Sequence, residues 1–207
     1  MRRRRVPILL VAVAFLVGAC GDGDDSTAIT EATLQGYLLT QDDVPTGFTQ
    51  QEVEEEEDDE EAADDTGSGC LEGDDDTVPS TADASAEFAT ADGTNQISHE
   101  VEAYEPGKAE EAMAEARRML EKCKTFSEPV EGTTMTGSLG STEFASFGDD
   151  TAAFTLQASI QGISVNGMFV VVRKGDVISG VGTVVTNAPI DRGALEGLVR
   201  KAVEKLP

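Results

Sequence analysis

The sequence predicts an α+β fold, in which a mainly antiparallel β-sheet carries two principal helices and one disulfide. Segments of alternating apolar residues are joined by short turns, which is typical of antiparallel pairing. Two other segments, 109–123 and 195–206, carry apolar residues at the 3.6-residue period of a helix. Because the order is strands, helix, strands, helix, we expect both helices on one face of the sheet.

The chain begins with the pattern of an export signal. Four arginines (Arg2–Arg5) precede a 12-residue apolar run, 6–17, and small residues follow it. The run is shorter than the ~20 residues that cross a bilayer as a helix. Because Cys20 directly follows a Gly-Ala pair, the segment is similar to a bacterial lipobox, and we predict a lipoprotein signal peptide over 1–19 with a lipid anchor at Cys20. A plain cleaved secretory signal and a retained membrane anchor are the alternatives.

Two polar regions lie near the start of the predicted domain, which covers 34–207. Residues 20–33 are polar and rich in Gly and Asp near their start, and they predict a flexible tether. An acidic insert is expected at about 51–69, because eleven of the fourteen residues at 52–65 are Asp or Glu. Like charges repel and stay solvated, so we expect this insert to be a disordered loop. Binding of calcium or of a cationic polymer by the loop stays open as an alternative.

A compact segment at 38–48 lies between the tether and the insert. Thr40 can cap a short helical turn with Asp43 three residues later, and Pro45 ends that turn. Gly47 then allows a change of direction before the chain continues. We interpret this segment as structural.

The first strands are expected at 85–90 and 96–104, on either side of the hairpin turn at Asp92 and Gly93. His99 shares one face of the second strand with apolar residues. It is the only histidine in the chain, and a general base needs a nucleophile or an oriented acid within reach. We therefore interpret His99 as a packed structural residue.

A helix follows Pro106, and its apolar stripe ends at Cys123, which places that cysteine on the buried side. A weaker strand is expected at 133–139, and a meander of three strands follows it. The middle strand of the meander, 163–172, is apolar on both faces and is therefore predicted to be central.

Two glycines and an aspartate mark the end of the chain. Gly180 and Gly182, on the last strand of the meander (177–185), permit close approach by another element or a ligand, and close packing is the preferred interpretation. Asp191 is expected to cap the last helix, whose C-terminal end carries basic residues.

The three cysteines divide between two roles. With Cys20 lipid-modified, Cys70 and Cys123 are left to form a disulfide, as such pairs usually do outside the cytoplasm. Closing this 53-residue separation stabilises the fold by ~4 kcal/mol in the chain-entropy model. Metal binding by the cysteine pair with His99 is the minor alternative.

The charge of the chain excludes one class of partner. The formal net charge is −25, and it becomes −29 when the four signal arginines are removed. Such a chain repels nucleic acid and anionic lipid headgroups. We expect no nucleic-acid partner and no cofactor.

Several short segments resemble those of actinobacterial envelope lipoproteins. They are 38–48, the helix that ends at Cys123, 147–152 and the hairpin at 170–176. Over roughly 38–206 the chain resembles the PknH-like extracellular sensor domain, the family named for the outer domain of a mycobacterial serine/threonine kinase. The resemblance implies an antiparallel sheet flanked by helices, structural disulfides and a cleft for an unidentified ligand. This chain departs from the family in its single candidate bridge and its acidic insert, and the resemblance carries over no catalytic residues.

We therefore expect a lipid-anchored lipoprotein on the outer side of the cell membrane, whose non-catalytic, sensor-like domain binds a ligand or partner of the envelope. The expected binding surface is a cleft between the sheet and the helix that begins near Lys108. The alternative is a structural or interaction protein that uses its acidic loop to bind cations or cationic partners. An envelope hydrolase is less favoured. Triad chemistry needs a histidine partner, and a chain with no Trp and 5% aromatic residues offers few platforms for sugars.

Overall fold

The computed structural model describes residues 29–52, 78–130 and 133–207. The predicted signal peptide, Cys20, Cys70, most of the predicted tether and most of the acidic insert lie outside these residues. The lipid anchor and the Cys70–Cys123 disulfide therefore stay predictions.

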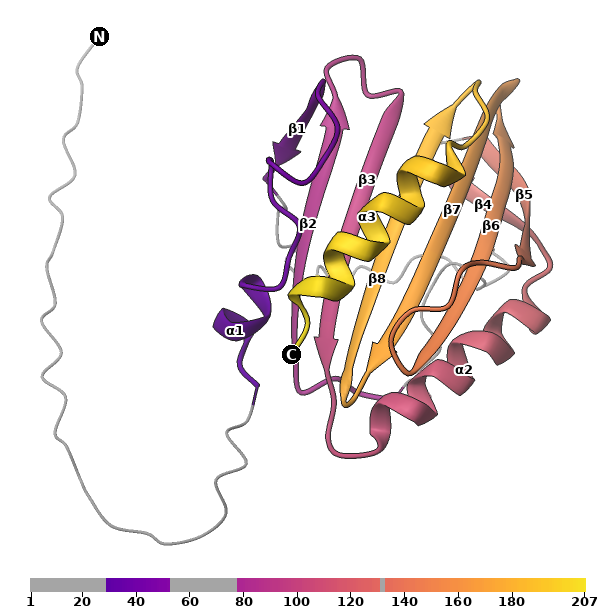
Figure 1. Ribbon diagram of the computed structural model, residues 1–207. Helices are drawn as coiled ribbons and strands as arrows, with labels where there is room; N and C mark the ends of the chain where they lie inside the picture. The colour runs from indigo at the N-terminus through magenta and orange to yellow at the C-terminus, as the bar shows by residue number, and fades with distance from the viewer. Residues whose placement is uncertain (1–28, 53–77, 131–132) are drawn as a thin grey trace, which may run out of the picture.

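The described residues form the predicted α+β fold, with one antiparallel sheet of eight strands and three helices (Figure 1). The strands are β1 (Phe48–Gln51), β2 (Ala82–Thr90), β3 (Asn95–Ala103), β4 (Thr125–Val130), β5 (Thr133–Ser141), β6 (Asp150–Ile160), β7 (Ile163–Lys174) and β8 (Val177–Thr186). The helices are α1 (Glu31–Gln35), α2 (Lys108–Lys122) and α3 (Arg192–Lys205).

The sheet consists of two groups of consecutive strands that meet in the middle. Its order is β1-β2-β3-β8-β7-β6-β5-β4, and every neighbouring pair is antiparallel. After β3, α2 carries the chain to the far edge, and β4 to β8 then return strand by strand until β8 pairs with β3. The predicted meander and the central place of β7 are confirmed.

The predicted hairpin between β2 and β3 is also confirmed. The Asp92 carboxylate accepts hydrogen bonds from the Thr90 hydroxyl at 2.7 Å and the Thr94 amide at 3.1 Å, and Gly93 has a φ of 68°. Tight hairpin turns favour an aspartate that accepts hydrogen bonds from residues of the same turn, and they favour a glycine where the backbone enters the left-handed region.

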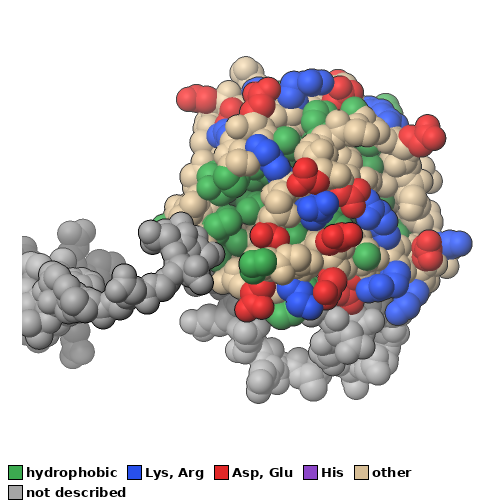
Figure 2. All heavy atoms as spheres, turned by 60° about the horizontal axis from the view of Figure 1, so that its bottom comes forward, with side chains coloured by type: hydrophobic (Ala, Val, Ile, Leu, Met, Phe, Trp, Pro, Cys, Tyr) green, Lys and Arg blue, Asp and Glu red, His purple; other side chains and the backbone are tan. Residues whose placement is uncertain are grey.

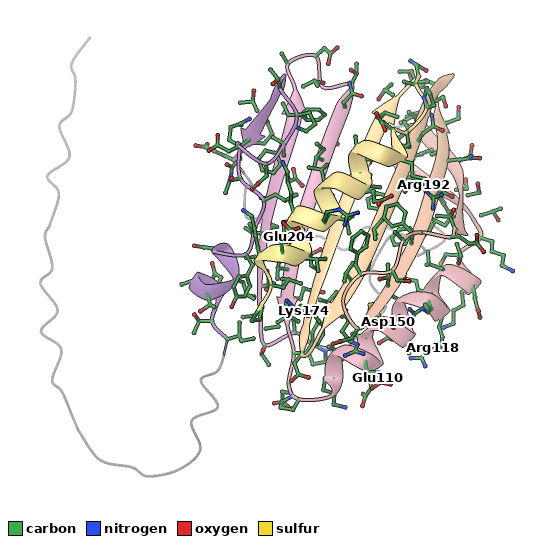
Figure 3. All side chains as sticks on the ribbon, in the orientation of Figure 1. Glu110, Arg118, Asp150, Lys174, Arg192 and Glu204 are labelled. Atoms are coloured by element: carbon green, nitrogen blue, oxygen red, sulfur yellow. The ribbon has the colours of Figure 1, made fainter. Side chains whose placement is uncertain are left out.

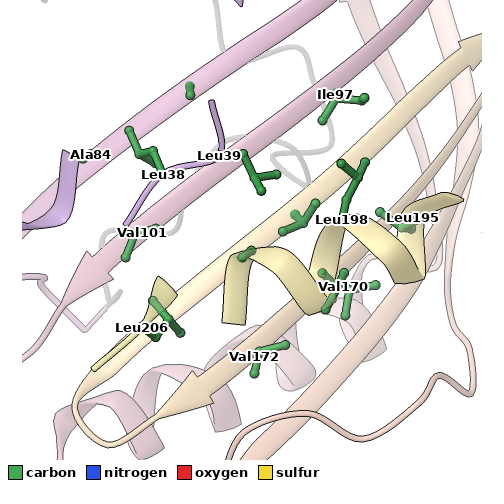
Figure 4. Packing of buried hydrophobic residues seen from close by; sticks show 14 of the residues in the cluster. Leu38, Leu39, Ala84, Ile97, Val101, Val170, Val172, Leu195, Leu198 and Leu206 are labelled. Carbon is green, nitrogen blue, oxygen red and sulfur yellow. The ribbon is translucent and has the colours of Figure 1, made fainter. Parts of the chain in front are cut away.

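The two long helices pack on opposite faces of the sheet, so the prediction that both lie on one face is wrong. The core under α3 includes Val170 and Val172 of β7 (Figure 4). The residue between them, Val171, packs instead against the cluster that contains the α2 residues Ala109 and Met113. Successive side chains of a strand point to opposite faces. The sequence of β7 is apolar on both faces, and each apolar face needs a helix to cover it. This pattern is therefore consistent with one helix on each face of the sheet.

Helix α3 covers the larger core. Its N-cap is Asp191, as predicted, whose Oδ1 accepts a hydrogen bond from the Ala194 amide at 3.0 Å. The helix buries Leu195, Leu198 and Val199 against the sheet. Each buried aliphatic side chain of this size stabilises the fold by about 1.5–3 kcal/mol.

Helix α2 covers part of the other face. It buries Ala109 and Met113, and Arg117 forms two hydrogen bonds of 2.9 and 2.6 Å with the Asp150 carboxylate at the start of β6. Cys123 is the C-cap residue and is 8% exposed, so the predicted buried position of this cysteine is confirmed.

The N-terminal segment packs on the α3 side. Helix α1 begins inside the range predicted as tether, and Leu34 is fully buried there. The expected turn forms at Thr40, whose amide and hydroxyl both donate to Asp43 at 2.9 Å. Asp43 also forms an ion pair of 2.7 Å with Lys205 of α3, which ties the segment to the last helix.

Two strands were not predicted. Strand β4 is an edge strand that contains Pro129, and β1 is a four-residue edge strand that ends where the acidic insert begins. Proline is tolerated at a sheet edge because its missing N–H faces away from the ladder. None of the helices within the described ranges is long and apolar enough to cross a membrane.

Candidate functional site

A groove of about 400 Å³ lies on the face of the sheet that α2 partly covers, which we call the α2 face. Strands β2, β3, β6, β7 and β8 contribute to it, and the register places these side chains away from α3. On this face the groove is lined by Ser85, Glu87, Ser98, Glu100, Phe154, Phe169, Val171, Gly180 and Gly182.

The floor of the groove is the pair of glycines on β8. A Cβ atom on Gly182 would lie 2.6 Å from the Phe169 ring and from the Ser98 hydroxyl, so that glycine is required for packing. Among the residues that the structure describes, no atom lies within 4 Å of the position that a Cβ atom on Gly180 would take. Close packing therefore explains Gly182, as preferred from the sequence, but it does not explain Gly180, which leaves open space.

One wall of the groove is apolar. Phe154 and Phe169 are directly paired across β6 and β7, and their rings stack with centroids 5.1 Å apart and planes 15° from parallel. Val171 lies beside them on β7 and faces the same side. Partly exposed aromatic rings in a concave site bind flat or apolar groups of a ligand.

The other wall is acidic. Glu100 of β3 is paired with Ser85 on one side and with Gly180 on the other, so its side chain borders the open floor. Glu87 is the other acidic residue of the lining. Glu102 lies next to the groove, two residues further along β3, and it is directly opposite Asp83 of β2. Like charges in directly opposed positions of a sheet destabilise it.

The two glutamates of β3 have raised pKa values. Glu100 is exposed, but partial loss of hydration raises its pKa, and the charges of Glu102 and Asp83 raise it further. Burial also raises the pKa of Glu102, against a lowering by the Tyr104 hydroxyl, which donates to it at 2.9 Å. Within the described residues, no basic side chain lowers either pKa.

The groove continues toward the β2–β3 turn. A second hollow of about 380 Å³ shares Glu87 and Ser98 with the first and extends past Gln96 to Gly93. Together the two hollows follow β3 along the α2 face, so the site can accept a ligand longer than one ring.

His99 lies on the α3 face of the same strand and is completely buried. Its Nδ1 accepts a hydrogen bond from the Leu39 amide at 2.9 Å, and its Nε2 lies 2.9 Å from the Ser179 hydroxyl. Because Nδ1 is an acceptor, the ring proton is on Nε2, which donates to Ser179. His99 therefore does not accept a proton from Ser179, and the prediction of a structural histidine is confirmed.

Burial lowers the pKa of His99 to about 4, and the charge of Lys205 lowers it as well, against a raising by Asp43. The ring is neutral at physiological pH. Its role is to hold the N-terminal segment to β3 through the Leu39 amide.

The groove is not the cleft that we expected between the sheet and the helix that begins near Lys108. None of the described residues that line the groove belongs to α2. Within the described ranges, no group of three or more His, Cys, Asp or Glu side chains could hold a metal ion.

Sequence reasoning missed the residues of this site, although part of the signal was present. The Gly180–Gly182 pair was noted, and Glu100 and Glu102 occupy the polar positions of an alternating strand. Their meeting depends on the pairing of β3 with β8, which are some eighty residues apart in the chain. No local pattern specifies that pairing.

Comparison with known proteins identifies the fold. No family model matches the chain, and no curated protein matches it in sequence. Among solved structures, the chain is similar to the extracellular domain of PknH from Mycobacterium tuberculosis, with a TM-score of 0.59 and 12% sequence identity. The likeness covers 84% of this chain and 96% of that domain. The expected PknH-like fold is therefore confirmed, and at this identity the likeness carries the fold alone.

Proposed function

We propose that this protein is a lipid-anchored lipoprotein of the cell envelope, whose non-catalytic domain binds a ligand on the α2 face of its sheet. The observation that carries the proposal is the groove above Gly180. No atom of the described ranges 29–52, 78–130 and 133–207 lies within 4 Å of the Cβ position of Gly180, so packing against these residues gives no reason for a glycine there. A bound molecule supplies the missing reason.

The proposed location on the outer side of the cell membrane is supported by two features. The first is the N-terminal pattern of four arginines, an apolar run and a Gly-Ala-Cys sequence. The second is the fold, which is similar to a domain that is extracellular in PknH. Replacement of Cys20 by Ala should release the protein from the membrane or leave it unprocessed, and processed protein that stays on the membrane would contradict the anchor.

A non-catalytic role is favoured by the state of the only histidine. His99 is buried, its Nδ1 accepts a hydrogen bond from the Leu39 amide, and its Nε2 donates one to Ser179. Neither ring nitrogen is therefore available to a substrate. Acyl-transfer chemistry by a triad needs a histidine that can take a proton from the nucleophile. Binding therefore fits the arrangement better than hydrolysis.

The proposed disulfide between Cys70 and Cys123 would fasten the chain before β2 to the end of α2. Mass spectrometry of the unreduced, proteolysed protein should show the two peptides linked. Detection of both cysteines as free thiols would refute this pairing.

Ligand binding is tested by a thermal-shift screen of the protein against envelope lipids, glycans and peptides. A ligand of the groove should raise the melting temperature of the wild type and have no such effect on Gly180→Val, which fills the floor. Gly140→Val is the matched control. Gly140 lies on β5, outside the groove, and a Cβ atom there would be 3.8 Å from its nearest neighbour, which is an ordinary contact distance. Equal shifts in all three proteins would place binding elsewhere.

A further inference from the structure

The acidic wall of the groove carries charge that the described chain does not neutralise. None of the ion pairs between described residues involves Asp83, Glu87, Glu100 or Glu102. The Glu100 carboxylate accepts no hydrogen bond from any described residue. On the face shown in Figure 2, by contrast, acidic and basic side chains are interspersed.

The apolar wall lies two strands away from this charge. Because neighbouring strands are about 4.8 Å apart, β3 and β7 are separated by about 10 Å, with β8 and its glycines between them. At the level of Gly180 the groove therefore has a carboxylate on one side, no side chain in the middle and Val171 on the other side. Phe169 continues the apolar side at the level of Gly182.

We propose that the groove binds an organic cation, with an ammonium group next to Glu100 and an apolar body that lies over Gly180 against Phe169. This inference rests on the proposed function and names the class of ligand that the groove accepts. The ammonium group supplies the positive charge that the acidic wall lacks.

A bare metal ion fits this site less well than an organic cation. Calcium takes six to eight oxygen ligands, and the described residues contain no group of side chains that could hold a metal ion. One wall of the groove is apolar and is formed by Phe154, Phe169 and Val171, which a small hydrated ion does not use. An ammonium group with an apolar body uses both walls.

Binding of a cation also has a consequence for protons. In the free protein, partial loss of hydration and neighbouring carboxylates raise the pKa of Glu100. A bound ammonium group favours the charged carboxylate and lowers that pKa. Binding should therefore release protons in the pH range where Glu100 titrates, and it should become weaker as the pH falls through that range.

The test is a titration of the isotope-labelled protein, followed by the amide NMR signals of Gly180 and Gly182. The probe is phenethylammonium, and its matched controls are the neutral phenethyl alcohol and the anionic hydrocinnamate, which share the aromatic body. Three variants accompany the wild type. Glu100→Gln removes the charge at the groove, Gly180→Val fills the floor, and Glu204→Gln removes the same charge from an exposed position on α3 (Figure 3).

Phenethylammonium should shift the signals of both glycines and bind on the order of tenfold more tightly than the alcohol, as expected for a charge-assisted contact. Glu100→Gln should remove that preference, Gly180→Val should abolish binding, and Glu204→Gln should leave the affinity unchanged. Calorimetry in two buffers of different ionisation enthalpy should detect proton release on binding to the wild type and none for Glu100→Gln.

Two results would overturn the inference in distinguishable ways. If the alcohol or hydrocinnamate binds at least as tightly as phenethylammonium, and Gly180→Val abolishes that binding, the ligand class is wrong and the proposed groove function stands. If none of the three probes shifts either glycine signal, both the ligand class and the groove function are contradicted.

Discussion

Acidification should destabilise this protein through His99, because the folded state holds its ring in a neutral form. The ring is completely buried, and its Nδ1 accepts from the Leu39 amide at 2.9 Å. Protonation would turn both ring nitrogens into donors and set one donor against another. A charged ring would also lie buried near Lys205, whose charge already opposes protonation.

The magnitude follows from the shift in pKa. The pKa of His99 is about 4 in the folded protein, against an ordinary value of 6.5. As the pH falls, the unfolded chain therefore takes up a proton before the folded chain does. The stabilisation is complete above 6.5, is lost as the pH falls from there toward 4, and changes no further below 4. Between about pH 7.5 and about pH 5 this single group should remove about 2 kcal/mol of unfolding free energy.

The assay is urea denaturation of the wild type and His99→Asn at both pH values. Asparagine keeps an acceptor for the Leu39 amide but does not titrate. At the higher pH the variant should be less stable than the wild type. At the lower pH the difference in unfolding free energy between the two proteins should be smaller by about 2 kcal/mol. Taking the difference between the two proteins cancels the titration of the many carboxylates that they share.

A second variant separates the titration from the packing. Ser179→Ala removes the partner of Nε2 but leaves the histidine, so it should lose stability at both pH values and keep the pH dependence of the wild type. If the difference in unfolding free energy between the wild type and His99→Asn is the same at both pH values, His99 does not destabilise the protein through its titration.

The remaining predictions concern the two glycines and the ends of α3. Gly182→Ala should lower the free energy of unfolding by about 1–3 kcal/mol, because its Cβ would meet other atoms at 2.6 Å, whereas Gly180→Ala should be neutral or stabilising by up to about 1 kcal/mol in urea denaturation. Asp191→Ala should cost about 1 kcal/mol through loss of the N-cap, measured in the same way, and no loss would refute the capping role. Burial raises the pKa of Asp43, but the hydrogen bond from Lys205 and others lower it to about 2. The stabilisation by this carboxylate is therefore complete above 3.8 and lost as the pH falls toward 2, and Lys205→Met should flatten that part of the stability curve.

Local features of the fold could be predicted from the sequence. The turn at Asp92 and Gly93 and the cap at Asp191 depend on residues within a few positions of each other, and both form as expected. The alternating and helical periods likewise identified β2, β3, the meander, α2 and α3. The edge strand β4 was missed because Pro129 and the absence of clear alternation hide it.

The features that depend on distant pairing could not be predicted. Placing α2 and α3 on one face was wrong, since the sequence gives the periods of helices and strands but not which face each helix covers. The groove arises where Glu100 of β3 meets Gly180 of β8. Only the three-dimensional pairing of these strands shows that one glycine is packed and that the other leaves a space.

The proposed ligand in the space above Gly180 should be present when the protein comes from its native envelope. Native mass spectrometry can test this on the wild type, Gly180→Val and Gly140→Val, each purified from native membranes. We expect a bound molecule with an ammonium group on the wild type and on Gly140→Val, and its absence from Gly180→Val. The same bound molecule at equal occupancy on wild type and Gly180→Val, or no bound molecule on the wild type, would contradict it.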